Sequence, residues 1–142
     1  MTDSANVELV RSIYADLERG DWSRLFQMAS ERTHPEFELV IADGPLAGSF
    51  PGVAEAEESF YGMLAAWEEI RFEVEEYRAL DDERVLVLEH RRARGKGSGV
   101  ETGAKAAGVA HFRDGKITRL VMYYDRDRAL ADLGLAPEGE AP

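Results

Sequence analysis

The sequence contains no cysteine, which excludes disulfide bonds and zinc sites built on thiolates. No apolar run approaches the ~20 residues that a membrane-spanning helix needs, and the first residues lack the basic flank and apolar core of a signal peptide. Basic side chains are outnumbered, because 17 Lys and Arg stand against 28 Asp and Glu, and the formal net charge is -11. An acidic surface disfavours nucleic acid and anionic membranes as partners. These absences predict a cytoplasmic protein that binds neither.

Histidine is also scarce, and the pattern of histidines gives no metal site. His34, His90 and His111 are the three present, no two of them have the spacing of metal ligands, and no HExxH-like motif occurs. The glycine-rich stretch 95–99 has no GxGxxG pattern and no helix after it, so it is not a phosphate cradle. We therefore expect no metal and no cofactor, and we leave the roles of His34 and His111 open.

The composition that remains is that of one folded unit. The chain has 142 residues, 44% of them apolar, which is enough for one hydrophobic core. It shows no internal repeat, low-complexity segment or linker. We predict a single domain over residues 1–142 with its core at about residues 7–135, and frayed residues at 137–142.

The segment from Arg84 to Asp125 predicts three consecutive strands of one sheet. The strands begin at Val85, at about Thr102 and at Ile117. The glycine-rich stretch 95–99 separates the first two strands. Asp114-Gly115 separates the last two and fits a two-residue hairpin. We expect the other elements to cover one face of this sheet.

Helical spacing marks four other segments. After Asn6, a plausible N-cap, apolar residues recur in one stripe until Gly20. Asp21 is placed to cap a second, shorter helix. The remaining two helices are expected at about Val53–Trp67 and at Asp127–Leu133, with Asp125 in the position of a cap for the last one.

Two further strands and a loop complete the order of elements. Alternating apolar residues predict a strand at Phe37–Ile41 that ends near Asp43, and another at Ile70–Tyr77. The stretch 44–52 contains two Pro and three Gly, which predicts a loop. Helices followed by a run of strands indicate an α+β fold with an antiparallel sheet.

This order resembles the NTF2-like superfamily, in which a curved sheet rolls around a long helix into a cone. Three local features are similar to its SnoaL-like branch. These are the start with Gly20-Asp21 between two helices, the turn Arg113–Ile117 into the final strand, and the ending Tyr123–Leu135. The resemblance covers about Val7–Leu135. It implies a cone whose curved mixed or antiparallel sheet wraps around the N-terminal helices.

The resemblance leaves the activity open, because the superfamily contains isomerases, dehydratases, epoxide hydrolases, polyketide cyclases, transport factors and members without known activity. One hypothesis is a protein that binds a small apolar molecule in the cone and carries out cofactor-free proton transfer on it. The other is a non-catalytic dimeric domain, or a ligand carrier, whose cone is filled or inert. A cavity of at least ~300 Å³ that reaches Asp43 or Glu89 would favour the first.

Asp43 is the first candidate catalytic residue. Placed against the steroid-isomerase members, it falls near their catalytic aspartate, and a carboxylate at an apolar pocket mouth can act as a general base. The alternative is a turn residue before Gly44. Where those enzymes have an oxyanion-hole tyrosine this chain has Ile13, with Tyr14 one position away, and Ala110 stands in place of their protonated aspartate. Steroid-isomerase chemistry is therefore disfavoured.

Glu89 and His90 are the other two candidate catalytic residues. Residues two apart share a face of a strand, so Glu89 and Arg91 are expected to point together with His90 opposite. Against the epoxide-hydrolase members, Glu89 and Arg91 stand in place of an arginine and an aspartate with the charges interchanged, and Met122 replaces the third residue. This disfavours epoxide hydrolysis. The alternative for Glu89 and Arg91 is a salt bridge at the wet end of the strand.

Bulky apolar side chains are the candidates for the lining of a pocket. The predicted lining residues are Tyr14, Phe60, Met63, Trp67, Met122 and Tyr124. If their rings meet in the middle, no substrate fits. A homodimer is also predicted, because Val87, Val109, Val121 and Tyr123 were assigned to an exposed outer face of the sheet.

Overall fold

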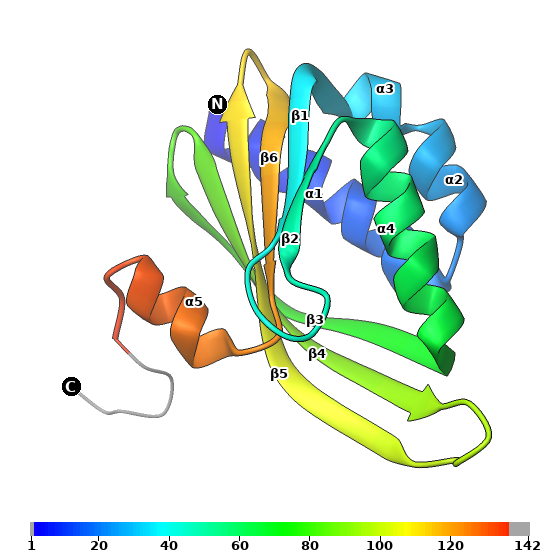
Figure 1. Cartoon of the computed structure of the whole chain (residues 1–142). Helices are drawn as coiled ribbons and strands as arrows, with labels where there is room; N and C mark the ends of the chain where they lie inside the picture. Colours follow the sequence, from blue (N-terminus) through cyan, green and yellow to red (C-terminus); the bar gives the residue numbers. More distant parts are fainter. Residues whose placement is uncertain (1, 137–142) are drawn as a thin grey trace.

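The computed structural model describes residues 2–136 and shows a curved six-stranded sheet with helices on its concave side (Figure 1). The strand order is β2-β1-β6-β5-β4-β3. Neighbouring strands are antiparallel except β1 and β6, which run parallel. The sheet is therefore mixed, and it is not closed into a barrel. The predicted α+β class and cone architecture are confirmed.

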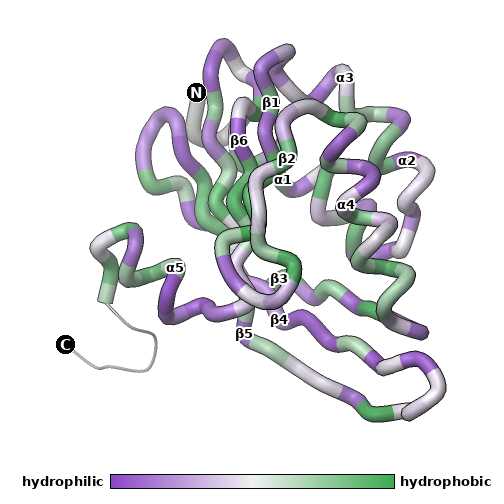
Figure 2. The backbone as a smooth tube through the Cα atoms, in the orientation of Figure 1, coloured by the Kyte–Doolittle hydropathy of each residue, from purple (hydrophilic) through white to green (hydrophobic). Residues whose placement is uncertain are grey.

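The strands follow the predicted ones with shifted ends. Their bounds are β1 Thr33–Ile41, β2 Gly48–Pro51, β3 Trp67–Asp81, β4 Arg84–Gly95, β5 Glu101–Arg113 and β6 Lys116–Tyr123. The two hairpin turns that join β3 to β4 and β5 to β6 are hydrophilic, whereas the middle of the sheet is hydrophobic (Figure 2). The strand predicted at Ile70–Tyr77 is longer at both ends than its apolar alternation indicated.

The helices are α1 Thr2–Arg19, α2 Trp22–Gln27, α3 Ala29–Arg32, α4 Val53–Ala66 and α5 Arg126–Asp132. Both predicted aspartate caps are present. Asp21 accepts a hydrogen bond from the Arg24 amide, and Asp125 accepts from the amides of Asp127 and Arg128. Within residues 2–136, none of the helices combines the length and the apolar character needed to cross a membrane.

Three boundaries were predicted wrongly. Asn6 is not an N-cap, because α1 begins at Thr2 and the buried Asn6 side chain donates to the Asp82 carbonyl at 2.9 Å. Trp67 does not end a helix but opens β3 in an extended conformation. The stretch 44–52 is not all loop, since its Gly48–Pro51 segment pairs with the edge of β1. Helix α3 was not predicted, and residues 137–142 lie outside the described part.

Strand β4 lies at the centre of the core because both of its faces are covered. On the concave face, Val85 and Val87 pack with Tyr14 of α1. On the convex face, Leu86 and Leu88 pack with α5. Burial on both sides explains why this strand reads as a continuous apolar run.

The predicted exposed outer face differs from the observed one. Val87 points to the concave side, while Val109, Val121 and Tyr123 are buried on the convex side in the cluster that includes α5. The four residues therefore do not form an exposed apolar face. Dimerisation stays a prediction, but an exposed apolar face of the sheet no longer supports it.

Helix α1 approaches the sheet most closely where Tyr14 meets Gly108 on β5. A Cβ atom added at Gly108 would clash with the Tyr14 hydroxyl oxygen, and the next nearest atoms, Tyr14 Cζ at 3.5 Å and Met122 Sδ at 3.6 Å, are in ordinary contact range. The Tyr14 hydroxyl donates to Met122 Sδ at 3.5 Å. A glycine at position 108 thus allows the fully buried tyrosine to lie against the backbone of β5.

We predict that Gly108→Ala lowers the free energy of unfolding by about 1–3 kcal/mol, because the added methyl group overpacks this contact. Tyr14→Phe removes the clashing oxygen and is expected to restore much of that loss in the double variant. Urea denaturation of the four proteins in this double-mutant cycle measures the coupling. Gly103→Ala on the same strand is the control, since its added Cβ would lie 3.5 Å from the nearest atom. Additive effects of the two changes would contradict the proposed contact.

Candidate functional site

A cavity of about 120 Å³ lies between the concave face of the sheet and helices α1 to α4. Most of its wall is apolar, with Phe37, Phe60, Met63, Phe72, Leu120 and Met122 among the lining residues. The volume is below the ~300 Å³ expected for drug-sized ligands and close to the ~150 Å³ of a cavity known to bind benzene. As it stands, the cavity has room for about one ring.

The predicted lining residues divide into two groups. Phe60, Met63, Met122 and Tyr124 line the cavity. Tyr14 is fully buried on the concave face but is not among the lining residues, because it contacts Gly108 and Met122 at the base of the sheet. Trp67 is also outside the lining, because it belongs to the start of β3 instead of the α4 face that was predicted for it.

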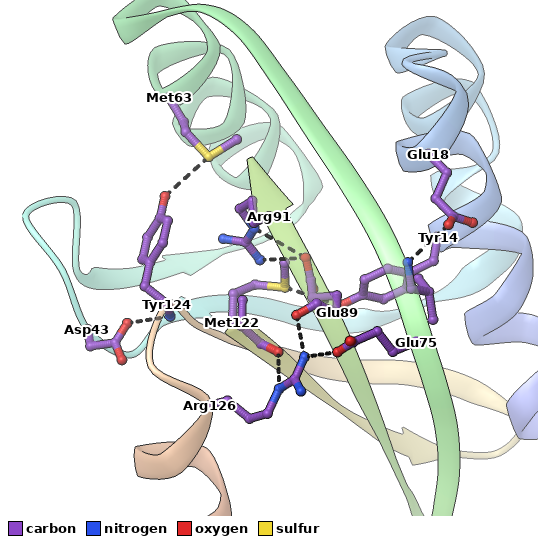
Figure 3. A network of polar contacts seen from close by, with 12 residues as sticks. Tyr14, Glu18, Asp43, Met63, Glu75, Glu89, Arg91, Met122, Tyr124 and Arg126 are labelled. Carbon is purple, nitrogen blue, oxygen red and sulfur yellow. Dashed lines mark hydrogen bonds and ion pairs between the residues drawn. The ribbon is translucent and has the colours of Figure 1, made fainter. Parts of the chain in front are cut away.

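The charged residues that line the cavity are both arginines, Arg32 and Arg91. Arg91 lies on β4 and is 5% exposed. Its Nε and Nη2 atoms donate to the same oxygen, Glu89 Oε1, at 3.2 and 3.1 Å (Figure 3). Its guanidinium carbon lies 5.1 Å from the centroid of the Phe72 ring and 4.9 Å from that of Tyr124. The cation is thus held by one carboxylate and two aromatic rings.

The carboxylate of this pair lies deeper than the arginine. Glu89 has no solvent exposure, and its Oε2 has no hydrogen-bond partner among the described residues. Burial is the largest single effect on the pKa of Arg91 and lowers it, but the charge and hydrogen bonds of Glu89, together with Tyr124 and Tyr14, raise it more, so the net pKa is raised. Burial and then the charge of Glu89 also raise the pKa of Tyr14 well above its ordinary value. Arg91 therefore stays charged and Tyr14 stays protonated at neutral pH.

Arg32 enters the cavity wall from the end of α3, and a second buried ion pair holds it. Its Nη1 atom lies 2.8 Å from Oδ2 of Asp16, which is itself fully buried on α1. The same carboxylate also contacts Arg19 at 2.5 Å and Arg24 at 3.4 Å. Three arginines thus contact one aspartate, but only Arg32 is buried with it, since the side chains of Arg19 and Arg24 are more than half exposed.

Asp43 makes two backbone contacts beside the site. Its Oδ1 accepts from the Tyr124 amide at 2.7 Å and its Oδ2 accepts from the Asp125 amide at 3.2 Å. It is not among the lining residues of the cavity. In this position the carboxylate joins the end of β1 to the end of β6, and each oxygen already has a partner.

His90 lies on the opposite side of the sheet from the cavity. It faces the convex groove with Glu69, Arg71 and Arg92, and its Nδ1 has no hydrogen-bond partner among the described residues. Strand alternation predicted that Glu89 and Arg91 would point together and His90 opposite, and the structure places them so. The pair lies in the core, however, and not at a wet strand end.

Sequence reasoning missed Arg32 and Asp16. One signal was available, because Asp16 lies three residues after Ile13 and directly before Leu17, both of which belong to the apolar stripe of α1. A charged residue at the border of such a stripe needs a buried partner. The identity of that partner depends on how α3 folds back on α1, and the sequence pattern does not contain this.

Among residues 2–136, no group of three His, Asp or Glu side chains has an arrangement that could hold a metal ion. The lining residues that carry polar side-chain groups are Arg91, Arg32, Tyr124, Thr33 and Ser59. The hydroxyl group of Thr33 already donates to the Ala29 carbonyl, and that of Tyr124 donates to Met63 Sδ.

Residues 10–120 match the SnoaL-like domain family, and the chain therefore belongs to that family. No curated protein matches the sequence. Solved structures with the same fold are numerous. TerC, co-crystallised with polyporic acid, is 23% identical with a TM-score of 0.72 over 91% of this chain and 97% of TerC.

Two further structures show the same likeness. A candidate SnoaL-like polyketide cyclase from Jannaschia sp. CCS1 is 14% identical, with a TM-score of 0.71 over 95% of each chain. An NTF2-like protein from Burkholderia xenovorans LB400 is 26% identical, with a TM-score of 0.67 over 92% of this chain and 95% of that one. The fold is therefore NTF2-like, as the order of elements predicted.

We predict that Glu89→Gln destabilises the protein by about 3 kcal/mol or more, because it leaves the buried Arg91 cation without its counter-charge. The double variant Glu89→Gln/Arg91→Gln replaces the ion pair by two neutral amides and is expected to be clearly more stable than Glu89→Gln alone. Urea denaturation checks both. Equal stability of Glu89→Gln and the native protein would show that the pair is not buried as described.

Proposed function

We propose that this SnoaL-like protein binds a small ring-containing apolar molecule in the cavity between α4 and the sheet. The observation that carries the proposal is the cavity itself, whose wall is almost entirely apolar. A dry apolar cavity near ~150 Å³ has measurable affinity for a single ring. TerC, which has this fold, was co-crystallised with polyporic acid, and this supports a small organic ligand here.

Cofactor-free proton transfer is the second candidate function. One observation favours it, namely that Glu89 Oε2 is fully buried without a hydrogen-bond partner while Tyr14 is held protonated nearby. A carboxylate with a free oxygen can accept a proton. Glu89 is not among the lining residues, however, so a substrate would have to displace Arg91 to reach it. The geometry therefore supports binding better than proton transfer.

The other two predicted catalytic residues are not part of this proposal. Both oxygens of Asp43 accept backbone hydrogen bonds, and His90 faces the convex side. Their catalytic roles stay predictions. So do the homodimer, for which light scattering should give about twice the chain mass of 15.8 kDa, and the cytoplasmic location.

We predict that Ala56→Leu weakens ligand binding by filling the cavity. Ala56 lies on α4, is buried and lines the cavity, so a larger apolar side chain at that position occupies the space of the ligand. Toluene is the probe, and isothermal titration calorimetry is expected to show at least about tenfold weaker binding, equivalent to ~1.4 kcal/mol. The variant should keep its fold, because the added methyl groups enter empty apolar space.

The matched control is Ala54→Leu, an exposed position on the same helix. It should bind toluene as the native protein does. Unchanged toluene binding by Ala56→Leu would place the ligand elsewhere. Absence of toluene binding by the native protein, together with absence of binding by every other ring tested, would refute the proposed function.

A further inference from the structure

The cavity wall has an unusual electrostatic character for so acidic a protein. The chain has a formal net charge of -11, yet the charged residues that line the cavity are Arg32 and Arg91, and no carboxylate is among the lining residues. Both arginines are 5% exposed, so water screens their charges weakly. Each is paired with a fully buried carboxylate, Arg91 with Glu89 and Arg32 with Asp16, so the wall presents cationic N–H donors while the carboxylates lie behind it.

The guanidinium group of Arg91 has N–H donors that do not bind Glu89. Glu89 occupies Nε and Nη2 with a single oxygen, and Nη1 makes no hydrogen bond with any described residue. Figure 3 shows this third nitrogen pointing away from Glu89. A guanidinium group presents its N–H donors in a fixed fork that matches the two oxygens of a carboxylate. The free edge of Arg91 is thus a ready partner for a charged oxygen in the cavity.

The aromatic rings around Arg91 suit the remainder of such a ligand. Phe72 and Tyr124 lie within 5.1 and 4.9 Å of the guanidinium carbon, and both also line the cavity. A ligand whose charged group binds Nη1 would place its apolar part among these rings and against Phe60 and Leu120. Rings pack well against such walls.

We infer that the molecule bound in the cavity is a small organic acid with one ring, whose carboxylate receives hydrogen bonds from Nη1 of Arg91. This inference rests on the proposed function and names the class of its ligand. It assigns to Arg91 the role of selecting anions over neutral molecules of the same shape. No proton is transferred and no bond is made in this role.

Benzoate and benzamide are the probes, because they share a ring and a planar head group and differ in charge at pH 7. Isothermal titration calorimetry with the native protein should show benzoate binding at least about tenfold more tightly than benzamide. Toluene serves as the neutral ring without a polar head group. The comparison needs no variant, so its outcome does not depend on whether a variant folds.

The double variant Glu89→Gln/Arg91→Gln tests the assignment to Arg91. It should bind benzoate and benzamide with about equal affinity. Arg71→Gln is the matched control, since it removes one arginine whose side chain is 69% exposed and lies outside the cavity wall. It should keep the native preference for benzoate.

The outcomes separate the two proposals. Equal binding of benzoate and benzamide by the native protein, or binding of toluene without binding of benzoate, overturns the anion inference and leaves the cavity as a binding site for neutral rings. A preference for benzoate that survives in the double variant overturns the role of Arg91. Absence of binding by all three probes counts against both proposals.

Discussion

The buried ion pair between Glu89 and Arg91 is the constraint on which the site depends. Two charges in an apolar interior are costly unless each is compensated, and the fold compensates them unequally. Arg91 has a carboxylate and two aromatic rings, whereas one oxygen of Glu89 has no hydrogen-bond partner within residues 2–136. The arginine can be held in the wall of the cavity because its ion-pair partner Glu89 is buried. Tyr14 lies next to Glu89 and packs against Met122 on the sheet. The position of α1 against Gly108 is thus linked to the position of the cation that a ligand would meet.

The sequence predicted the sheet well because its central strands obey simple alternation. Glu89 and Arg91 share the concave face and His90 lies opposite, as residues two apart on a strand must. The same rule places Val87 on the concave face with Glu89, so the prediction that Val87 belongs to the outer face was wrong. Trp67 shows a different limit. Its position as the last helical or the first extended residue depends on the pairing of β3 with β4, which is a tertiary contact.

The cavity could be predicted only in outline. Apolar residues on α4 and β6 indicated a lining, and Phe60, Met63, Met122 and Tyr124 are found there. The contact of Asp16 with Arg32 joins residues 16 positions apart through the fold of α2 and α3, and no local pattern encodes it. Asp43 illustrates a further case, in which the sequence suggested a candidate catalytic residue and the structure shows a carboxylate that binds two backbone amides. Membership of the SnoaL-like family therefore defines the fold, while the side chains inside the cone determine the chemistry.

The central claim is that the concave face encloses an apolar cavity with Arg91 in its wall. The most direct measurement is the crystal structure of the native protein under xenon pressure, since xenon enters dry apolar cavities of this size. We predict a xenon site in contact with Phe72 and Met122, beside the guanidinium group of Arg91. Side chains that fill this volume, with no xenon between α4 and the sheet, would contradict the account.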